Sequence, residues 1–252
     1  MFSETLEKLD EYGIKKVNFL KQSKTKYFIA SALAGFYVGL GIFLIMTIGG
    51  VTSQSGYQYK IFMGLGFGIA LSLVIMAGSE LFTGNNMAMF SGMLNKKITV
   101  KDGINIWIFS YIGNLAGSML VGLLFFLSKA ANKDITAFLL NTAKAKMNTP
   151  APDLFFKGVL CNILVCLAVL SAVKLKEETA KLIMIFWCLF AFITTGFEHS
   201  VANMSLFSAA LLYPHPQEIS LIGFGYNLLW VTLGNITGGC ALGAAYYIMG
   251  KK

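Results

Sequence analysis

A histidine and two glutamates stand within apolar stretches that are long enough to cross a lipid bilayer. Glu80 lies in one stretch, and Glu198 and His199 lie side by side in a later one. Around them, hydroxyl, amide and glycine residues interrupt the apolar pattern over residues 78–87 and 196–204. Because an ionisable side chain at membrane depth is costly to keep, it is first considered as part of a path for a solute or a proton.

The two interruptions indicate broken helices. Both read Gly-x-Glu, then a polar stretch, then Asn-Met. Irregular backbone in hydrocarbon leaves peptide groups without partners, so it persists only inside protein or beside water. Two broken helices in matching positions of two halves predict a permeation or binding site near the middle of the membrane.

The polar residues of these stretches have candidate roles in such a site. We expect His199 to line the pore. Glu80 and Glu198 fit a structural role, accepting bonds from freed backbone N–H groups or pairing with a lysine, with direct participation in transport as the alternative. Three further residues are candidates to hydrogen-bond His199 or a passing solute: Thr83, Asn162 and Asn203. An asparagine within a span is costly unless paired, which predicts a polar network.

Large apolar residues near the breaks are candidates for narrow, water-excluding constrictions. They are Phe67, Leu71, Leu81, Phe82 and Phe192. Taken singly, each is also typical of ordinary core packing. Lys146 lies in the segment between two spans, where a lysine by itself is typical of a solvated surface charge.

The elements that must position these residues follow from composition and hydropathy. The chain has 252 residues, a mean hydropathy of +0.68 and only 13% charged residues, which is typical of a polytopic membrane protein. We expect six spanning helices, with the second and fifth broken, at residues 27–50, 61–93, 104–128, 153–173, 181–212 and 219–249. The segment 129–152 reads as a long loop, with Asp153 as the cap of the fourth helix.

Residues 1–26 read as a separate amphipathic helix ahead of a six-helix channel domain at residues 27–250. Phe2, Leu6, Leu9, Val17 and Leu20 are spaced for one apolar face. Two interpretations are open: an anchor on the cytoplasmic membrane surface, or a gate over a pore mouth.

Charge and internal similarity fix the expected topology. All basic residues are lysines, and most fall on one side of the membrane if both termini are cytoplasmic, so the net charge of +8 reflects topology and not nucleic-acid binding. Residues 113–117 match residues 234–238 in the pattern Gly-Asn-x-x-Gly, in the same order as the two breaks. Two matched pairs favour an inverted repeat of three helices each.

Enzyme chemistry has no sequence signature here. We find no nucleotide-binding loop, no cluster with metal-ligand spacing, and no nucleophile beside an orienting base. The four cysteines fall in apolar runs and are expected to be buried and reduced. The sequence therefore predicts a protein that is not an enzyme and needs no metal or cofactor.

With these features in view, the chain resembles the formate/nitrite transporter family over nearly its whole length. The resemblance rests on residues 35–41, 78–84, 155–168, 197–204 and 227–235. In amino-acid sequence these stretches resemble the nitrite-channel branch more than the formate branch, and the hydrosulfide-channel branch is also similar. The resemblance implies an aquaporin-like protomer in a homopentamer of the cell membrane, with one pore in each protomer.

The resemblance also implies roles for single residues. Leu81 and Phe192 would line the central or outer constriction, and Phe67 and Leu71 the cytoplasmic slit. Thr83 and His199 would face each other at the polar centre. The residues that match family positions tuning the electrostatics around the histidine are Lys146, Glu198, Asn162 and Asn203.

These implications suggest transport of small monovalent anions of weak acids: nitrite, formate or hydrosulfide. A bare anion in an apolar slit faces a desolvation cost of up to tens of kcal/mol. Holding a proton at pH 7 on an acid with a pKa near 4 costs only about 4 kcal/mol. A pore that protonates the anion near His199 is therefore the expected mechanism, with the proton coming from the histidine or from water.

Two other functions compete with this one. A neutral-solute channel of aquaporin type is suggested by the repeat, although such a channel is expected to contain twin Asn-Pro-Ala boxes and neither break contains a proline. A structural membrane protein without a permeant leaves the paired breaks and His199 unexplained. The sequence leaves open which anion is physiological, the direction of flux, and the choice between a channel and a proton-coupled transporter.

Overall fold

The structure is a computed structural model that describes residues 2–251. This described part is all-helical, and six of its helices are long and apolar enough to cross a membrane. The six are α2 (Lys24–Thr52), α3 (Tyr59–Met76), α5 (Val100–Ser128), α7 (Ala151–Lys174), α8 (Glu178–Thr195) and α10 (Leu221–Gly250). The other elements are α1 (Phe2–Gln22), the 3-10 turn η1 (Ser53–Ser55), α4 (Phe82–Leu94), α6 (Lys133–Met147) and α9 (Ser200–Ala210).

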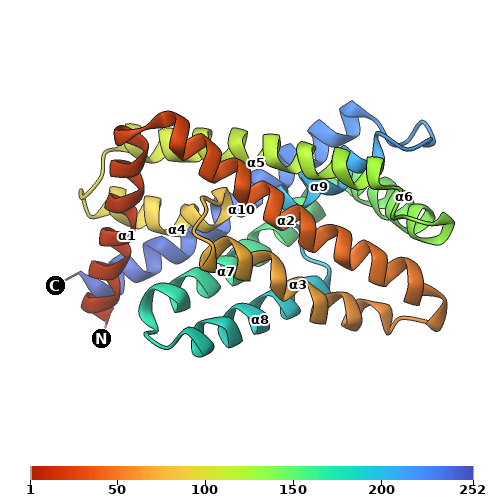
Figure 1. Cartoon of the computed structure of the whole chain (residues 1–252). Coiled ribbons are helices and arrows are strands. Elements are labelled where there is room, and N and C mark those ends of the chain that lie inside the picture. Colours follow the sequence, from red (N-terminus) through yellow and green to blue (C-terminus); the bar gives the residue numbers. More distant parts are fainter. Residues whose placement is uncertain (1, 252) are drawn as a thin grey trace.

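The second and fifth spans are broken, as predicted. The chain leaves α3 through Gly78 and re-enters a helix as α4, and it leaves α8 through Gly196 and continues as α9. Gly78 has φ +74° and Gly196 has φ +78°, in the left-handed region that a residue without Cβ adopts most readily. In Figure 1, α4 lies toward the end that holds α1, and α9 lies toward the end that holds α6.

The two halves pack by the same rule, which confirms the expected repeat. The first long helix of each half packs on the last, α2 on α5 and α7 on α10. Each half-helix then packs on the last helix of the other half, α4 on α10 and α9 on α5, while α3 meets α8. The two half-helices are therefore each held by the opposite repeat, and their N-termini are brought to the middle of the molecule.

Glycines allow the long helices to approach closely enough for this packing. A Cβ on Gly117 of α5 would collide with the carbonyl group of Ala32 in α2. In the other half, a Cβ on Gly238 of α10 would collide with the carbonyl group of Val159 in α7. Small residues at such crossings permit backbone-to-backbone contact, which is the main source of close packing between helices in lipid.

The segment between the third and fourth spans differs from its prediction. Residues 129–152 contain α6, whose N-cap Asn132 accepts a hydrogen bond from the Ile135 N–H at 2.9 Å. Its buried face is Ile135, Leu139, Ala143 and Met147. The expectation of a loop was wrong because a short amphipathic helix lies outside the long apolar runs. Asp153 is not the cap of α7 either, since Pro150 holds the N-cap position and Asp153 lies in the first turn.

The amphipathic face of α1 packs on protein. Leu6, Leu9, Val17 and Leu20 are buried, against the α4 and α10 side of the bundle, while Phe2 is exposed. The helix ends at Gln22, and Ser23 caps α2 by accepting a hydrogen bond from the Lys26 N–H at 3.3 Å. The start of α1 and the end of α10 lie at the same end of the bundle, opposite α6 (Figure 1).

The glycine crossing gives a first prediction. We expect Gly117→Val to lower the unfolding free energy by about 3 kcal/mol or more, because the new side chain must push α2 away from α5. Thermal unfolding in detergent measures the change. The matched control is Gly225→Ala, where the added Cβ meets no atom of the described chain within 4 Å. Equal stability of Gly117→Val and the control would contradict the close crossing.

Candidate functional site

The N-termini of the two half-helices meet at a hydrogen bond between Thr83 and His199. Thr83 is in the first turn of α4, and His199 is the N-cap residue of α9. Thr83 Oγ1 lies 2.8 Å from His199 Nε2, and both side chains are buried. The sequence placed these residues 116 positions apart, and the inverted packing of the halves brings them together.

The hydrogen bonds of His199 fix which ring nitrogen bears the proton. The backbone N–H of Ala202 donates to Nδ1 at 3.1 Å, so Nδ1 acts as an acceptor and has no proton. In the neutral imidazole the proton is then on Nε2, which donates to Thr83 Oγ1. The threonine hydroxyl keeps its own hydrogen free to donate to a third group.

Apolar residues form a narrow chamber beside His199. The chamber has a volume of about 10 Å³ and is lined by His199 together with Leu81, Phe192, Phe67 and Leu71. The Phe192 ring stacks on the imidazole with centroids 6.0 Å apart, and the Phe67 ring meets Phe192 edge-on at 5.5 Å. This volume is at the lower limit for a single water molecule.

Phe82 is not part of this chamber. Its ring packs edge-on against Tyr111 at 5.0 Å and lines a separate apolar hollow beside Trp107. Leu81 is the N-cap residue and Phe82 is the first residue of α4, so the side chains of these neighbours leave the backbone in different directions. Four of the five apolar candidates therefore converge, and Phe82 lies elsewhere.

Two wider cavities adjoin the narrow chamber. The α6-side cavity, of about 180 Å³, shares His199 and Phe192 with the chamber and is also lined by Lys146 and Asn203. The α1-side cavity, of about 310 Å³, shares Leu71 and Leu81 with the chamber and is also lined by Lys16 and Glu80. The shared residues place the three spaces in a row that runs between the two ends of the bundle.

A buried ion pair lies at the α6-side cavity. Lys146 Nζ lies 2.7 Å from Glu198 Oε1, and the Asn203 amide donates to Glu198 Oε2 at 2.7 Å. The Lys146 side chain is 25% exposed, whereas the Glu198 side chain is 5% exposed. Taken alone, Lys146 was expected to be a solvated lysine, whereas the resemblance implied a role in the electrostatics around His199. The residue lies on α6, lines the cavity, and is paired with the buried Glu198 carboxylate.

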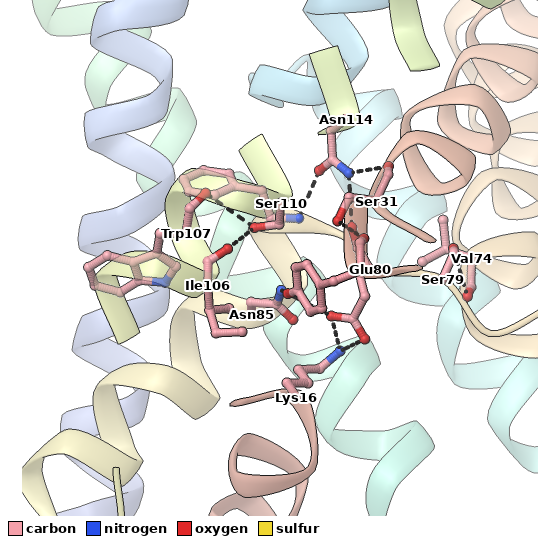
Figure 2. Close-up of polar contacts among 12 residues, drawn as sticks. Lys16, Ser31, Val74, Ser79, Glu80, Asn85, Ile106, Trp107, Ser110 and Asn114 are labelled. Atoms are coloured by element: carbon pink, nitrogen blue, oxygen red, sulfur yellow. Dashed lines mark hydrogen bonds and ion pairs between the residues drawn. The ribbon is translucent and has the colours of Figure 1, made fainter. Parts of the chain in front are cut away.

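A matching pair lies at the α1-side cavity. Lys16 Nζ contacts both Glu80 oxygens, at 2.8 and 2.9 Å (Figure 2). Tyr27 and Asn85 donate to the same carboxylate. Burial opposes the charge on Lys16, but attraction to Glu80 outweighs burial and raises the pKa of this lysine. The stabilisation is thus fully present below the usual lysine pKa and is lost only as pH rises through the raised value.

The asparagine candidates bind groups next to the Thr83–His199 hydrogen bond: the Thr83 carbonyl and the Glu198 carboxylate. Asn162 donates to the Thr83 carbonyl at 3.0 Å and accepts from Asn86 at 3.2 Å. Asn203 donates to Glu198 and to Asn227. Within the described chain, no side-chain hydrogen bond joins Asn162 or Asn203 to the His199 ring, although the Asn203 backbone N–H donates to the His199 carbonyl at 3.0 Å.

Several site residues escaped sequence analysis. They are Lys16, Tyr27, Asn85, Asn86, Asn114, Asn227 and Asn235. Two signals were available. Glu80 precedes Asn85 by five residues, as Glu198 precedes Asn203, and both pairs make the same contact; Asn114 and Asn235 are the asparagines of the matching Gly-Asn-x-x-Gly segments. Lys16 had no such signal, because its partner depends on how α1 docks.

Comparison with known proteins places this geometry among related channels. The family model described as formate/nitrite transporter matches residues 3–249. The nitrite transporter NirC of Salmonella typhimurium is 43% identical over 257 residues, covering 100% of this chain and 93% of the relative. A solved FNT family ion channel superimposes with a TM-score of 0.92 at 41% identity, covering 98% of each chain. A pentameric formate channel with formate bound gives a TM-score of 0.82 at 26% identity, covering 91% of this chain and 98% of the other.

The α1-side ion pair gives a second prediction. We expect Lys16→Met to lower the unfolding free energy by about 3 kcal/mol or more, because it leaves the Glu80 carboxylate buried without its cation. The double variant Lys16→Met/Glu80→Gln should regain most of this loss. Thermal unfolding in detergent measures both.

Lys8→Met is the matched control for that experiment. It removes the more exposed pair with Glu4 on the same helix, and because exposed ion pairs contribute little, stability should stay close to that of the parent protein. A Lys16→Met protein no less stable than Lys8→Met would show that α1 does not neutralise Glu80.

Proposed function

This chain belongs to the formate/nitrite transporter family, and from that premise we propose that it passes small monovalent anions of weak acids through the row of three cavities. It is a multi-pass membrane transport protein and not an enzyme. Nitrite and formate are the first candidate permeants, since they appear in the names of its relatives, and hydrosulfide is the third. The observation that supports the pore most directly is that His199, which is hydrogen-bonded to Thr83, lines its narrowest chamber.

The charges around the pore attract an anion without holding it. Lys146 and Lys16 each line a wide cavity, so either mouth offers an ammonium group. Each lysine is already paired with a glutamate, so the net charge of the two pairs is zero. The N-termini of α4 and α9 add partial positive charge at the chamber. Weak attraction of this kind suits conduction, which requires that a permeant leave as readily as it enters.

The apolar chamber requires that the anion be neutralised before it passes. The proton that neutralises the anion could come from His199 or from water, and the tautomer of His199 argues against the histidine. Complete transfer of the Nε2 proton would leave the ring without any proton, since Nδ1 is occupied as an acceptor of the Ala202 N–H. We infer that water in the wide cavity supplies the proton, while the Nε2–H polarises the Thr83 hydroxyl, which donates a hydrogen bond to the permeant.

We place the α1 end of the pore in the cytoplasm. The lysine distribution favours cytoplasmic termini, and the start of α1 and the end of α10 lie at the α1 end. The α6-side cavity is then the outer mouth. We also propose a homopentamer with one pore per protomer, which is supported by the relative that is named as pentameric.

Anion uptake tests the proposal. Purified protein in liposomes loaded with a pH dye should acidify the lumen when nitrite, formate or hydrosulfide is added, saturably and beyond protein-free liposomes. We expect His199→Phe to lower this uptake at least tenfold, which corresponds to about 1.4 kcal/mol in the barrier. His215→Gln, which removes the exposed loop histidine, is the control.

Chloride distinguishes protonated from bare passage. A strong-acid anion cannot be neutralised at pH 7, so chloride flux should stay near the protein-free rate. Rapid chloride flux would contradict neutralisation in the chamber, and uptake unchanged by His199→Phe would remove the central role of the histidine.

A further inference from the structure

A fully buried asparagine on α5 makes three hydrogen bonds at the first break. Asn114 Oδ1 accepts from the Phe82 N–H at 2.8 Å, and its amide nitrogen donates to the Glu80 carbonyl at 2.9 Å and the Ser31 carbonyl at 2.7 Å. Figure 2 shows the side chain reaching from α5 to both Ser31 and the backbone at Glu80. One amide group therefore ties the break to α2 and α5.

The second break has the same arrangement on α10. Asn235 Oδ1 accepts from the Ser200 N–H at 2.9 Å, and its amide nitrogen donates to the Glu198 carbonyl at 3.0 Å and the Gly158 carbonyl at 2.9 Å. Asn235 is also fully buried. The two asparagines are the second residues of the matching Gly-Asn-x-x-Gly segments, so the repeat preserves all three bonds in both halves.

Each asparagine brackets one particular residue. Asn114 binds the carbonyl before Leu81 and the N–H after it, and Asn235 binds the carbonyl before His199 and the N–H after it. Both bracketed residues are extended, Leu81 with φ −96° and ψ 123° and His199 with φ −118° and ψ 118°. In extended backbone these two peptide groups point to the same side, so a side-chain amide can pair with them as a neighbouring strand would.

The bracketed residues are the two N-cap residues that line the narrow chamber. We propose that Asn235 and Asn114 are positioning residues of the pore, which hold His199 and Leu81 with their side chains in the chamber. The proposal rests on the proposed function for its effect on transport. If each asparagine served only to satisfy its own polar atoms, other buried backbone groups would serve equally well. Instead, both asparagines bind the two peptide groups that flank a residue lining the chamber.

The role of Asn235 has a readout that does not need transport. In the His215→Gln background, His199 is the remaining histidine of the chain, so a tag-free sample labelled with ¹⁵N-histidine reports this ring alone. We expect the parent protein to show one unprotonated and one protonated nitrogen, the Nε2–H tautomer. With Asn235→Leu we expect both tautomers, because the Ala202 N–H no longer meets Nδ1 in a fixed geometry.

A double-mutant cycle tests the same role in transport. Asn235→Leu should lower formate or nitrite uptake at least tenfold in the parent protein, and should lower it less than twofold further in the His199→Phe background. Thr237→Val, two residues along α10 and exposed, is the control and should leave uptake unchanged. Asn114→Leu should be coupled in the same way to Leu81→Ala, with Ser118→Ala on α5 as its control.

The outcomes separate the two proposals. A single unchanged tautomer in Asn235→Leu, or an equal loss of uptake in both backgrounds, would overturn the positioning role. If Asn235→Leu fails to fold, Asn235→Asp keeps the oxygen that accepts from Ser200, loses the two amide donors, and is judged by the same spectrum and the same cycle. If the parent protein shows no anion uptake, the proposed function fails while the spectrum still decides the role of Asn235.

Discussion

The structure depends on the need to neutralise two carboxylates inside the membrane. Glu80 and Glu198 each precede the N-cap residue of a half-helix, and each is nearly inaccessible to water. An isolated carboxylate in such a place would be strongly destabilising. The cations come from α1 and α6, which do not span the membrane, so these two helices complete the bundle at opposite ends. Their docking leaves a charged, water-accessible cavity at each end and an apolar chamber between them.

The two halves share a backbone plan and differ in the residue at its centre. Glutamate, N-cap residue and asparagine occupy the same relative positions at both breaks. The N-cap residue is Leu81 in one half and His199 in the other. The repeat therefore sets the backbone geometry of the pore. The difference between these residues gives the chamber one polar side chain, His199, among apolar residues such as Leu81. A second histidine in place of Leu81 would bring two ionisable rings into a space of about 10 Å³.

Hydropathy and internal similarity were enough to predict six spans, two breaks and the inverted repeat. They made Thr83 one of three candidates to bond His199, and the resemblance to the family implied that these two residues face each other. These features depend on long apolar runs and on short segments that interrupt them. The errors concern contacts that packing decides. Lys146 and Lys16 find their partners only when α6 and α1 dock, and Phe82 turns toward Tyr111 because α4 begins there. Asn162 donates to the Thr83 carbonyl and not to His199. Residue spacing along one helix does not determine which of several neighbouring acceptors such an amide binds.

The neutral balance of charge explains why such a pore suits weak acids. A lone lysine at each mouth would bind an anion tightly and slow its release, whereas a lysine paired with a buried glutamate presents a cation to water at little net charge. An anion drawn to Lys146 then meets an apolar wall of Phe192, Leu81 and Phe67, which a bare charge crosses only at great cost. In the proposed mechanism, a weak acid meets the lower barrier by taking up a proton before the chamber and releasing it beyond. On that proposal, selectivity against strong-acid anions depends on the acid strength of the permeant, without a binding site shaped to its size.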